Sequence, residues 1–213
     1  MGMWQKNIPS HLVTFIGNAV DFVGISQSIA DRALIDDRNT VLLVGRLIDS
    51  KGFSEVVDAI SLLPNDLHLT FKIIGQGPLA NILLAQIEKH DLVGRVQVVQ
   101  DSPDWWSELA NAKLLISMSK FEGTPNVVLE AAASGCPVLL SDISAHREIF
   151  SVNSAVFVDL ASSTKLINAI INVFGDYSEA LKRAQNAKRI VMNMSVVEME
   201  KSYGRIYKKV WDY

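Results

Sequence analysis

Two glutamates lie eight positions apart in the segment FEGTPNVVLEAAASG. Thr124 is a favourable N-cap and Pro125 is a favourable first helical residue, so we expect a helix to begin at about this point. Glu122 then lies in the preceding loop, while Glu130 lies on the helix about one and a half turns in. The two carboxylates are therefore expected to reach one crevice from two different elements.

The start of that helix offers a second kind of group. Its first amides have no partners within the helix, so they present donors and a partial positive charge, the setting in which phosphate binds. A carboxylate accepts hydrogen bonds from paired hydroxyls, so Glu130 suits a ribose and Glu122 suits a sugar. The alternative for Glu130 is an exposed helical residue. Its neighbours at 127–129 and 131–133 are apolar, however, which indicates a partner for the lone acid.

Two cations follow an apolar run further upstream. In GRLIDSKG, Gly45 lets the chain turn closely, and Arg46 and Lys51 stand five positions apart. Two cations near a strand end suit the charge of a diphosphate, although two solvated side chains beside a turn are the alternative. A second segment, GQGP, carries Gly75 and Gly77, and it fits either a ligand loop or an ordinary turn into a helix.

The elements that must position these residues follow from the apolar pattern. Short runs rich in Val, Ile and Leu lack polar alternation, which is typical of strands buried on both faces. We expect strands over residues 40–46, 68–75, 95–100, 113–119, 136–141 and 154–159. We expect helices over residues 53–63, 78–90, 104–111, 125–134 and 145–149. The alternation predicts an α/β fold with a doubly wound parallel sheet, in which ligands bind outside the carboxyl ends of the strands.

The two flanks of this core are expected to differ. Residues 1–39 form an N-terminal segment like an interdomain linker, with a strand predicted over 13–21 and a short helix over 26–35. The core domain is expected to cover residues 40–160. Residues 161–213 are expected to form C-terminal helices that pack on it, and helical spacing predicts them over 162–174, 178–194 and 196–211.

The last of these regions is basic. Residues 178–213 carry eight Lys or Arg and four acidic residues. A solvated basic face is one interpretation, and contact with an anionic membrane surface or partner is the other.

Composition excludes several classes of protein. The chain has 213 residues, 49% of them hydrophobic and 20% charged, as in an ordinary soluble globular protein. The net charge of -3 argues against a nucleic-acid binder. A lone cysteine, Cys136, fits a reducing compartment, so the cytoplasm is expected. No apolar run approaches the roughly 18 residues that span a bilayer, and the start has no apolar core like that of a signal peptide.

The histidines do not predict a metal site. His11, His68 and His90 lie far apart without metal-ligand spacing. His146, in SAHREI, follows an expected strand end, where it either faces the crevice or lies on the surface at the start of a helix.

Four segments in this order, GRLIDSKG, IIGQGPL, FEGTPNVVLEAAASGCPVL and SDISAHREI, resemble the C-terminal domain of retaining, nucleotide-sugar-dependent glycosyltransferases of family 4, also called group 1. Glu122 and Glu130 form that family's E-x7-E pattern. The resemblance is strong over about residues 40–160. It implies one Rossmann-like half of a GT-B fold, so a missing N-terminal domain or a partner subunit is expected to complete the site.

The resemblance also implies roles for individual residues. Arg46 and Lys51 would hold the donor diphosphate, and Glu122 would bind hydroxyls of the transferred sugar, so these three are the expected catalytic residues. Glu130 would bind the ribose, and the loop over 100–103 would lie near the base. The donor-binding residues implied in this way are Gly45, Gly75, Gly77, Gln100, Asp101, Gly123, Thr124, Pro125, Asn126 and Glu130.

The activity that the resemblance implies is transfer of a hexose from a UDP- or GDP-linked donor to a glycan or lipid-linked acceptor. It implies no cofactor and no metal, because fixed cations and helix amides would stabilise the leaving diphosphate. A non-catalytic nucleotide-sugar-binding module and a nucleotide-sugar epimerase of the same fold are the alternatives. We expect no nucleic-acid partner, and we consider a peripheral contact with the inner face of the membrane.

Overall fold

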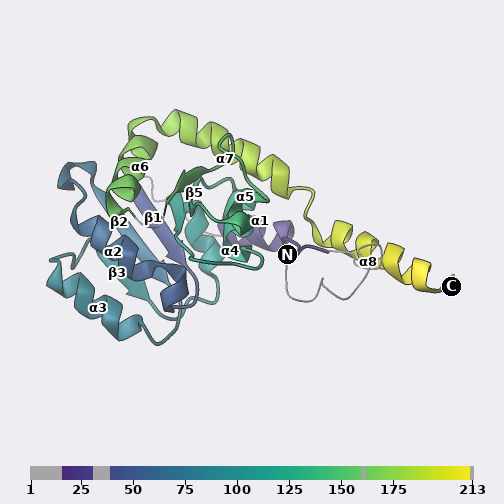
Figure 1. Ribbon diagram of the computed structural model, residues 1–213, viewed down its shortest axis with the longest axis horizontal. Helices are drawn as coiled ribbons and strands as arrows, with labels where there is room; N and C mark the ends of the chain where they lie inside the picture. The colour runs from purple at the N-terminus through teal and green to yellow at the C-terminus, as the bar shows by residue number, and fades with distance from the viewer. Residues whose placement is uncertain (1–15, 31–38, 160–161, 212–213) are drawn as a thin grey trace.

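The chain folds around one parallel sheet whose six strands run in the order β3-β2-β1-β4-β5-β6 (Figure 1). The computed structural model describes residues 16–30, 39–159 and 162–211. The strands are β1 (Asn39–Val44), β2 (Leu69–Ile74), β3 (Val96–Val99), β4 (Ala112–Ser117), β5 (Val138–Ser141) and β6 (Val156–Val158). Each of the six expected strands is present, with bounds that differ from the expected ones by at most two residues, and the prediction of a doubly wound α/β fold is confirmed.

Helices cover both faces of this sheet. They are α1 (Phe22–Ala30), α2 (Phe53–Ser61), α3 (Ala80–Lys89), α4 (Asn126–Ser134), α5 (Ser144–Arg147), α6 (Ser163–Gly175), α7 (Tyr177–Val191) and α8 (Val196–Trp211). Helices α2, α3 and α6 share one apolar core with the sheet, and α1 and α4 share the other. Helix α7 contributes Ala180 to the first core and Ala187 and Val191 to the second. Along β1, Val41 and Leu43 face the first core and Leu42 faces the second, so the strand has no polar side.

Three of the expected elements differ in detail. The segment expected to be a helix over 104–111 is a short 3-10 helix, Trp105–Ala110. The predicted strand over 13–21 lies partly outside the described residues, and its described part forms only an isolated bridge from Val20 to Ser195. Helix α1 begins earlier than expected because the carboxylate of Asp21 accepts a hydrogen bond from the amide of Gly24 (2.9 Å), as an N-cap does. The end of that predicted helix, 31–35, lies outside the described residues.

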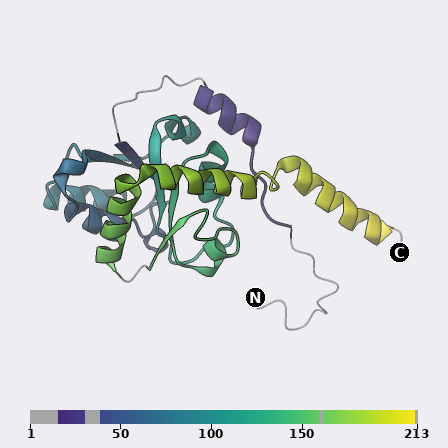
Figure 2. The ribbon, with the colours of Figure 1, turned by 90° about the horizontal axis from the view of Figure 1, so that it is seen from above.

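The C-terminal helices leave the sheet in succession. Helices α6 and α7 begin after Ser162 and Asp176, whose side chains cap them, and both bury apolar residues against the domain. Helix α8 differs, because none of its residues is buried and it extends away from the domain in both views (Figures 1 and 2). Among the described residues, no helix is both long enough and apolar enough to cross a membrane.

The order of the strands decides where a ligand can enter. The chain moves from β1 to β2 and β3 on one side, and then crosses to β4, β5 and β6 on the other. The loops that leave β1 and β4 therefore diverge, and in open parallel sheets this switch point is where ligands bind.

Candidate functional site

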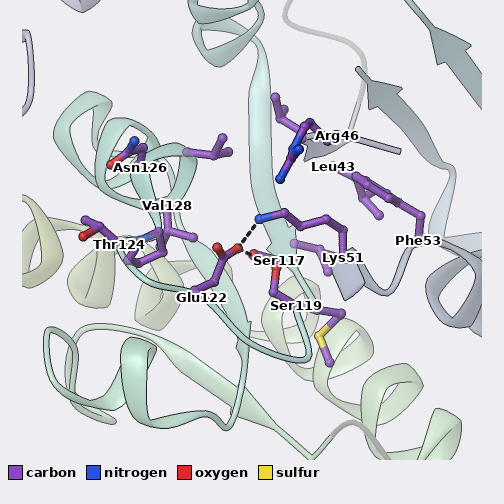
Figure 3. A pocket seen from close by; sticks show the side chains of 16 residues that line it. Leu43, Arg46, Lys51, Phe53, Ser117, Ser119, Glu122, Thr124, Asn126 and Val128 are labelled. Carbon is purple, nitrogen blue, oxygen red and sulfur yellow. Dashed lines mark hydrogen bonds and ion pairs between the residues drawn. The ribbon is translucent and has the colours of Figure 1, made fainter. Parts of the chain in front are cut away.

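A cavity of about 300 Å³ lies at the carboxyl ends of β1 and β4 (Figure 3). Gly45, Arg46 and Lys51 line it from the chain that follows β1. Glu122 lines it from the loop after β4, and the start of α4 closes it through Thr124, Pro125 and Asn126. The predicted cations, one predicted acid and the helix start are therefore brought together at the switch point.

Glycines hold the loops around this cavity in close contact. Gly52 has a left-handed φ of 70°, and a Cβ added there would lie 2.2 Å from the carbonyl oxygen of Met118, so the chain after β1 touches the chain after β4. A Cβ on Gly75 would lie 1.8 Å from the carbonyl oxygen of Gly45. A Cβ on Gly77 would lie 2.4 Å from that of Leu47. The GQGP segment thus lies beneath the Arg46 loop and supports it, outside the lining of the cavity.

An ion pair spans the cavity. The Nζ of Lys51 lies 2.5 Å from Oε1 of Glu122, and the hydroxyl of Ser119 donates to the same oxygen at 2.7 Å (Figure 3). The side chains of Lys51 and Glu122 keep 23% and 14% of their exposure, so water screens this pair only in part. The arrangement offers a cation and a carboxylate side by side, with Arg46 exposed on the same wall.

The start of α4 corrects one detail of the sequence analysis. Helix α4 begins at Asn126 with Pro125 as its N-cap, and no side chain caps it, so the prediction of Thr124 as N-cap is wrong. The reason is a turn: the amide of Asn126 donates to the carbonyl of Thr124 at 3.0 Å, which leaves the proline in the capping position. Proline has no N–H, and the amides of Asn126 and Val128 already donate to the carbonyls of Thr124 and Pro125, so the donors expected here are the amides of Gly123, Thr124 and Val127.

Glu130 lies elsewhere on α4. It is half-buried beside Trp106 of the 3-10 helix and does not line the cavity. Burial raises the pKa of Glu130, and the neighbouring Trp106 indole lowers it in part. The indole N–H is buried and faces this carboxylate, although no regular hydrogen bond joins them in the described chain. Gln100 and Asp101 follow β3, are exposed, and also lie outside the cavity lining.

The structure adds residues that the sequence analysis did not select. Ser119 donates a hydrogen bond to Glu122, but the sequence analysis placed it at the end of an expected strand. Its position at the carboxyl end of a strand was the signal that could have identified it, because ligands bind there in parallel sheets. The side-chain amide of Asn18 donates to Oδ1 of Asn126 at 2.8 Å, so the N-terminal segment reaches the edge of the cavity. No local pattern in the sequence marks that contact.

The described residues hold no group of three or more His, Cys, Asp or Glu side chains that could bind a metal ion. Cys136 is buried, and burial raises the pKa of its thiol to about 12. Its thiol is therefore protonated and unreactive at neutral pH.

Comparison with known proteins gives a consistent set of similarities. A family model described as glycosyl transferases group 1 matches residues 25–190. The N-acetylgalactosamine-N,N'-diacetylbacillosaminyl-diphospho-undecaprenol 4-alpha-N-acetylgalactosaminyltransferase of Campylobacter jejuni is 28% identical over 173 residues, which cover 80% of this chain and 46% of that protein. The lipopolysaccharide core biosynthesis glycosyltransferase LpsE of Rhizobium meliloti is 27% identical over 171 residues, which cover 78% of this chain and 49% of that protein.

Solved structures share the fold. Sucrose-phosphate synthase from Thermosynechococcus elongatus has a TM-score of 0.81 at 20% identity, covering 92% of this chain and 52% of that one. Anabaena Alr3699/HepE, solved in complex with UDP and glucose, has a TM-score of 0.81 at 21% identity, covering 94% of this chain and 58% of that one. The chain thus spans about half the length of the curated relatives named above.

Proposed function

This chain belongs to the glycosyl transferases of group 1, and from that premise we propose that it supplies the nucleotide-sugar-binding half of a retaining glycosyltransferase. The observation that carries the proposal is the cavity at the switch point, where Arg46, Lys51 and Glu122 meet the start of α4. In this proposal the Rossmann-like domain covers residues 40–160, with residues 1–39 as a linker-like segment and 161–213 as appended helices.

The chemistry proposed for this cavity is stabilisation of a leaving group. When the bond between sugar and diphosphate breaks, negative charge develops on the diphosphate oxygens. Arg46, Lys51 and the amides at the start of α4 are fixed donors that would neutralise this charge without reorganising. Glu122 would hold hydroxyls of the transferred sugar, because a carboxylate accepts such hydrogen bonds. Retention would then follow front-face attack by the acceptor, with no protein nucleophile.

Known relatives guide the choice of the nucleotide, of the acceptor and of the part that would complete the active site. The HepE structures contain UDP, UDP-glucose, or UDP and glucose, so UDP is the first nucleotide to test, followed by GDP. The Campylobacter relative carries diphospho-undecaprenol in its name, which supports a lipid-linked or glycan acceptor. Because the chain spans about half of such relatives, we propose that an N-terminal acceptor domain or a partner subunit completes the active site.

Helix α8 suggests a peripheral contact with the inner face of the membrane. Its cations recur at helical spacing, at Lys201, Arg205, Lys208 and Lys209. Its apolar residues recur on another side, at Tyr203, Ile206, Tyr207 and Val210, and Trp211 is 90% exposed. An amphipathic helix with cations and interfacial aromatic residues fits an anionic lipid surface. Sedimentation with vesicles of phosphatidylglycerol and phosphatidylcholine tests this contact, and failure of the chain to sediment would contradict it.

The donor site is tested by calorimetric titration of the chain with UDP, GDP and ADP in the absence of metal. We expect saturable binding of one nucleotide, weakened about tenfold or more by Arg46→Ala, since loss of a charge-assisted contact is worth roughly 1.5–3 kcal/mol. Glu130→Ala tests the ribose role separately, because Glu130 lies outside the cavity lining. Arg189→Ala removes an exposed cation of α7 and serves as the matched control.

Two results would contradict the proposal. A folded wild-type chain that binds none of the three nucleotides would remove the support for the site. Equal loss of affinity in Arg46→Ala and Arg189→Ala would show that the cations act only through net charge. Binding without any transfer after the completing half is supplied would instead favour a non-catalytic nucleotide-sugar-binding module.

A further inference from the structure

Three of the four polar side chains that are buried in the described part of the chain gather behind Glu122. Ser119 is 1% exposed, and Ser141 and His146 are fully buried. Ser119 follows β4, Ser141 ends β5, and His146 lies on α5. Burying polar groups costs free energy unless they are paired, so three of them gathered behind one carboxylate require an explanation.

Hydrogen bonds join the three residues into one path that ends at the cavity. The hydroxyl of Ser141 donates to the carbonyl oxygen of Ser119 at 2.6 Å. The hydroxyl of Ser119 in turn donates to Oε1 of Glu122 at 2.7 Å. The path thus fixes both the backbone and the side chain of Ser119, the residue in direct contact with Glu122.

His146 anchors the far end of this path. Its Nδ1 lies 2.9 Å from the carbonyl oxygen of Ser141 and 3.3 Å from the hydroxyl oxygen of the same residue. Because a carbonyl oxygen only accepts, Nδ1 must carry the proton, which leaves Nε2 as an unprotonated atom. Nε2 is buried and has no hydrogen-bond partner in the described part of the chain.

Burial keeps this imidazole neutral. It lowers the pKa of His146, while the Ser141 carbonyl raises the pKa, and the charges of Glu122 and Lys51 act on it in opposite directions. A second proton on Nε2 would place an unpaired charge in the core. The ring is therefore held in one tautomer, and it acts as a fixed donor toward Ser141.

The path leaves the two oxygens of Glu122 in different states. Oε1 accepts from both Lys51 and Ser119, whereas the described residues give Oε2 no hydrogen bond (Figure 3). We propose that Ser119, Ser141 and His146 are positioning residues, which hold the Glu122 carboxylate in one orientation so that Oε2 accepts from hydroxyls of the donor sugar. This inference deepens the proposed function and rests on it, since Glu122 is there the residue that binds the sugar.

The decisive readout is the ratio of affinities for UDP-glucose and UDP, measured by calorimetry on the full chain. A loosened Glu122 loses contact with the sugar but not with the diphosphate. Ser119→Ala and Ser141→Ala are therefore expected to lower the ratio about threefold to tenfold, the worth of one hydrogen bond, while the affinity for UDP is not lowered. Ser154→Ala is the matched control, because Ser154 is 1% exposed and hydrogen-bonded far from the cavity.

A conservative pair tests the role of the imidazole. His146→Asn keeps an N–H donor at about the place of Nδ1, whereas His146→Leu removes it. The asparagine variant is expected to retain the wild-type ratio and the leucine variant to lower it. Equal ratios in all folded variants and the wild type would overturn the proposal.

A second measurement needs no ligand, and it separates this inference from the proposed function. Acylation of lysines by acetic anhydride, followed by mass spectrometry, reports how well Lys51 is protected by Glu122. Ser119→Ala and Ser141→Ala should raise the rate at Lys51 severalfold relative to Lys165, an exposed lysine on α6. If the wild type binds no nucleotide, the proposed function fails. An unchanged rate of Lys51 acylation in these folded variants would independently overturn the positioning role.

Discussion

Replacing Lys51 by Met and Glu122 by Gln, singly and together, measures how strongly the ion pair couples the loops after β1 and β4. Exposed pairs contribute about 0–1 kcal/mol, and breaking a fully buried pair costs roughly 3–5 kcal/mol. The side chains here keep 23% and 14% of their exposure and share a contact of 2.5 Å, which places the pair between these limits. We therefore expect a coupling energy of about 2 kcal/mol in the double-mutant cycle.

The assay is unfolding in urea, followed by far-ultraviolet circular dichroism, with the same cycle run by heating. Each single variant is expected to lower the melting temperature by roughly 4–8 °C, the shift that about 2 kcal/mol causes in a domain of this size. The double variant should be no less stable than either single one, because it leaves no unpaired charge. The pair of Lys165 and Asp159, at 3.2 Å and 63% and 55% exposed, is the control, with a coupling of about 0.5 kcal/mol or less. Equal coupling in both cycles would refute the argument from burial.

Three further predictions concern the glycine contact, the buried histidine and the last helix. Gly52→Ala should destabilise the domain by roughly 2–4 kcal/mol in urea unfolding, because the added Cβ would lie 2.2 Å from the Met118 carbonyl oxygen. Gly94 also has a left-handed φ but has open space around it, so Gly94→Ala should cost only about 1 kcal/mol. Burial lowers the pKa of His146 below 6.5, so the unfolded state takes up a proton at a higher pH than the folded state does. The free energy of unfolding should therefore fall as the pH drops below 6.5, by at most about 1.4 kcal/mol per pH unit. Unchanged stability between about pH 7.5 and 5 would contradict this prediction. Deleting α8 after Ser195 should leave the melting temperature within about 2 °C of the full chain's value, since none of its residues is buried, and a larger fall would reveal packing of α8 on the domain.

Much of the fold could be predicted from the sequence because the sheet is covered on both faces. Strands such as β1 then appear as unbroken apolar runs, which are the strongest local signal of a buried strand. Boundaries were less predictable. The end of a run does not show where hydrogen bonding to the next strand stops, so Ser119 was read as part of a strand although β4 ends at Ser117.

The site could be predicted where it depends on strand order, and not where it depends on side-chain direction. Arg46, Lys51 and Glu122 meet because the carboxyl ends of β1 and β4 are adjacent, which the rule for parallel sheets anticipates. Glu130 is different, because the rotation of α4 directs it toward Trp106, and one and a half turns along a helix do not specify that rotation. His146 was equally undetermined, since its sequence fits a surface helix start, yet α5 buries it completely.

The short bridge between Val20 and the turn before α8 links two parts of the chain that are far apart in the sequence. The amide of Val20 donates to the carbonyl of Met194 at 2.8 Å, so the segment before α1 and the segment before α8 are joined at one place. Asn18, two residues from this bridge, is hydrogen-bonded to Asn126 at the cavity edge. The turn before α8 is thus linked to the rim of the cavity through the backbone of residues 18–20.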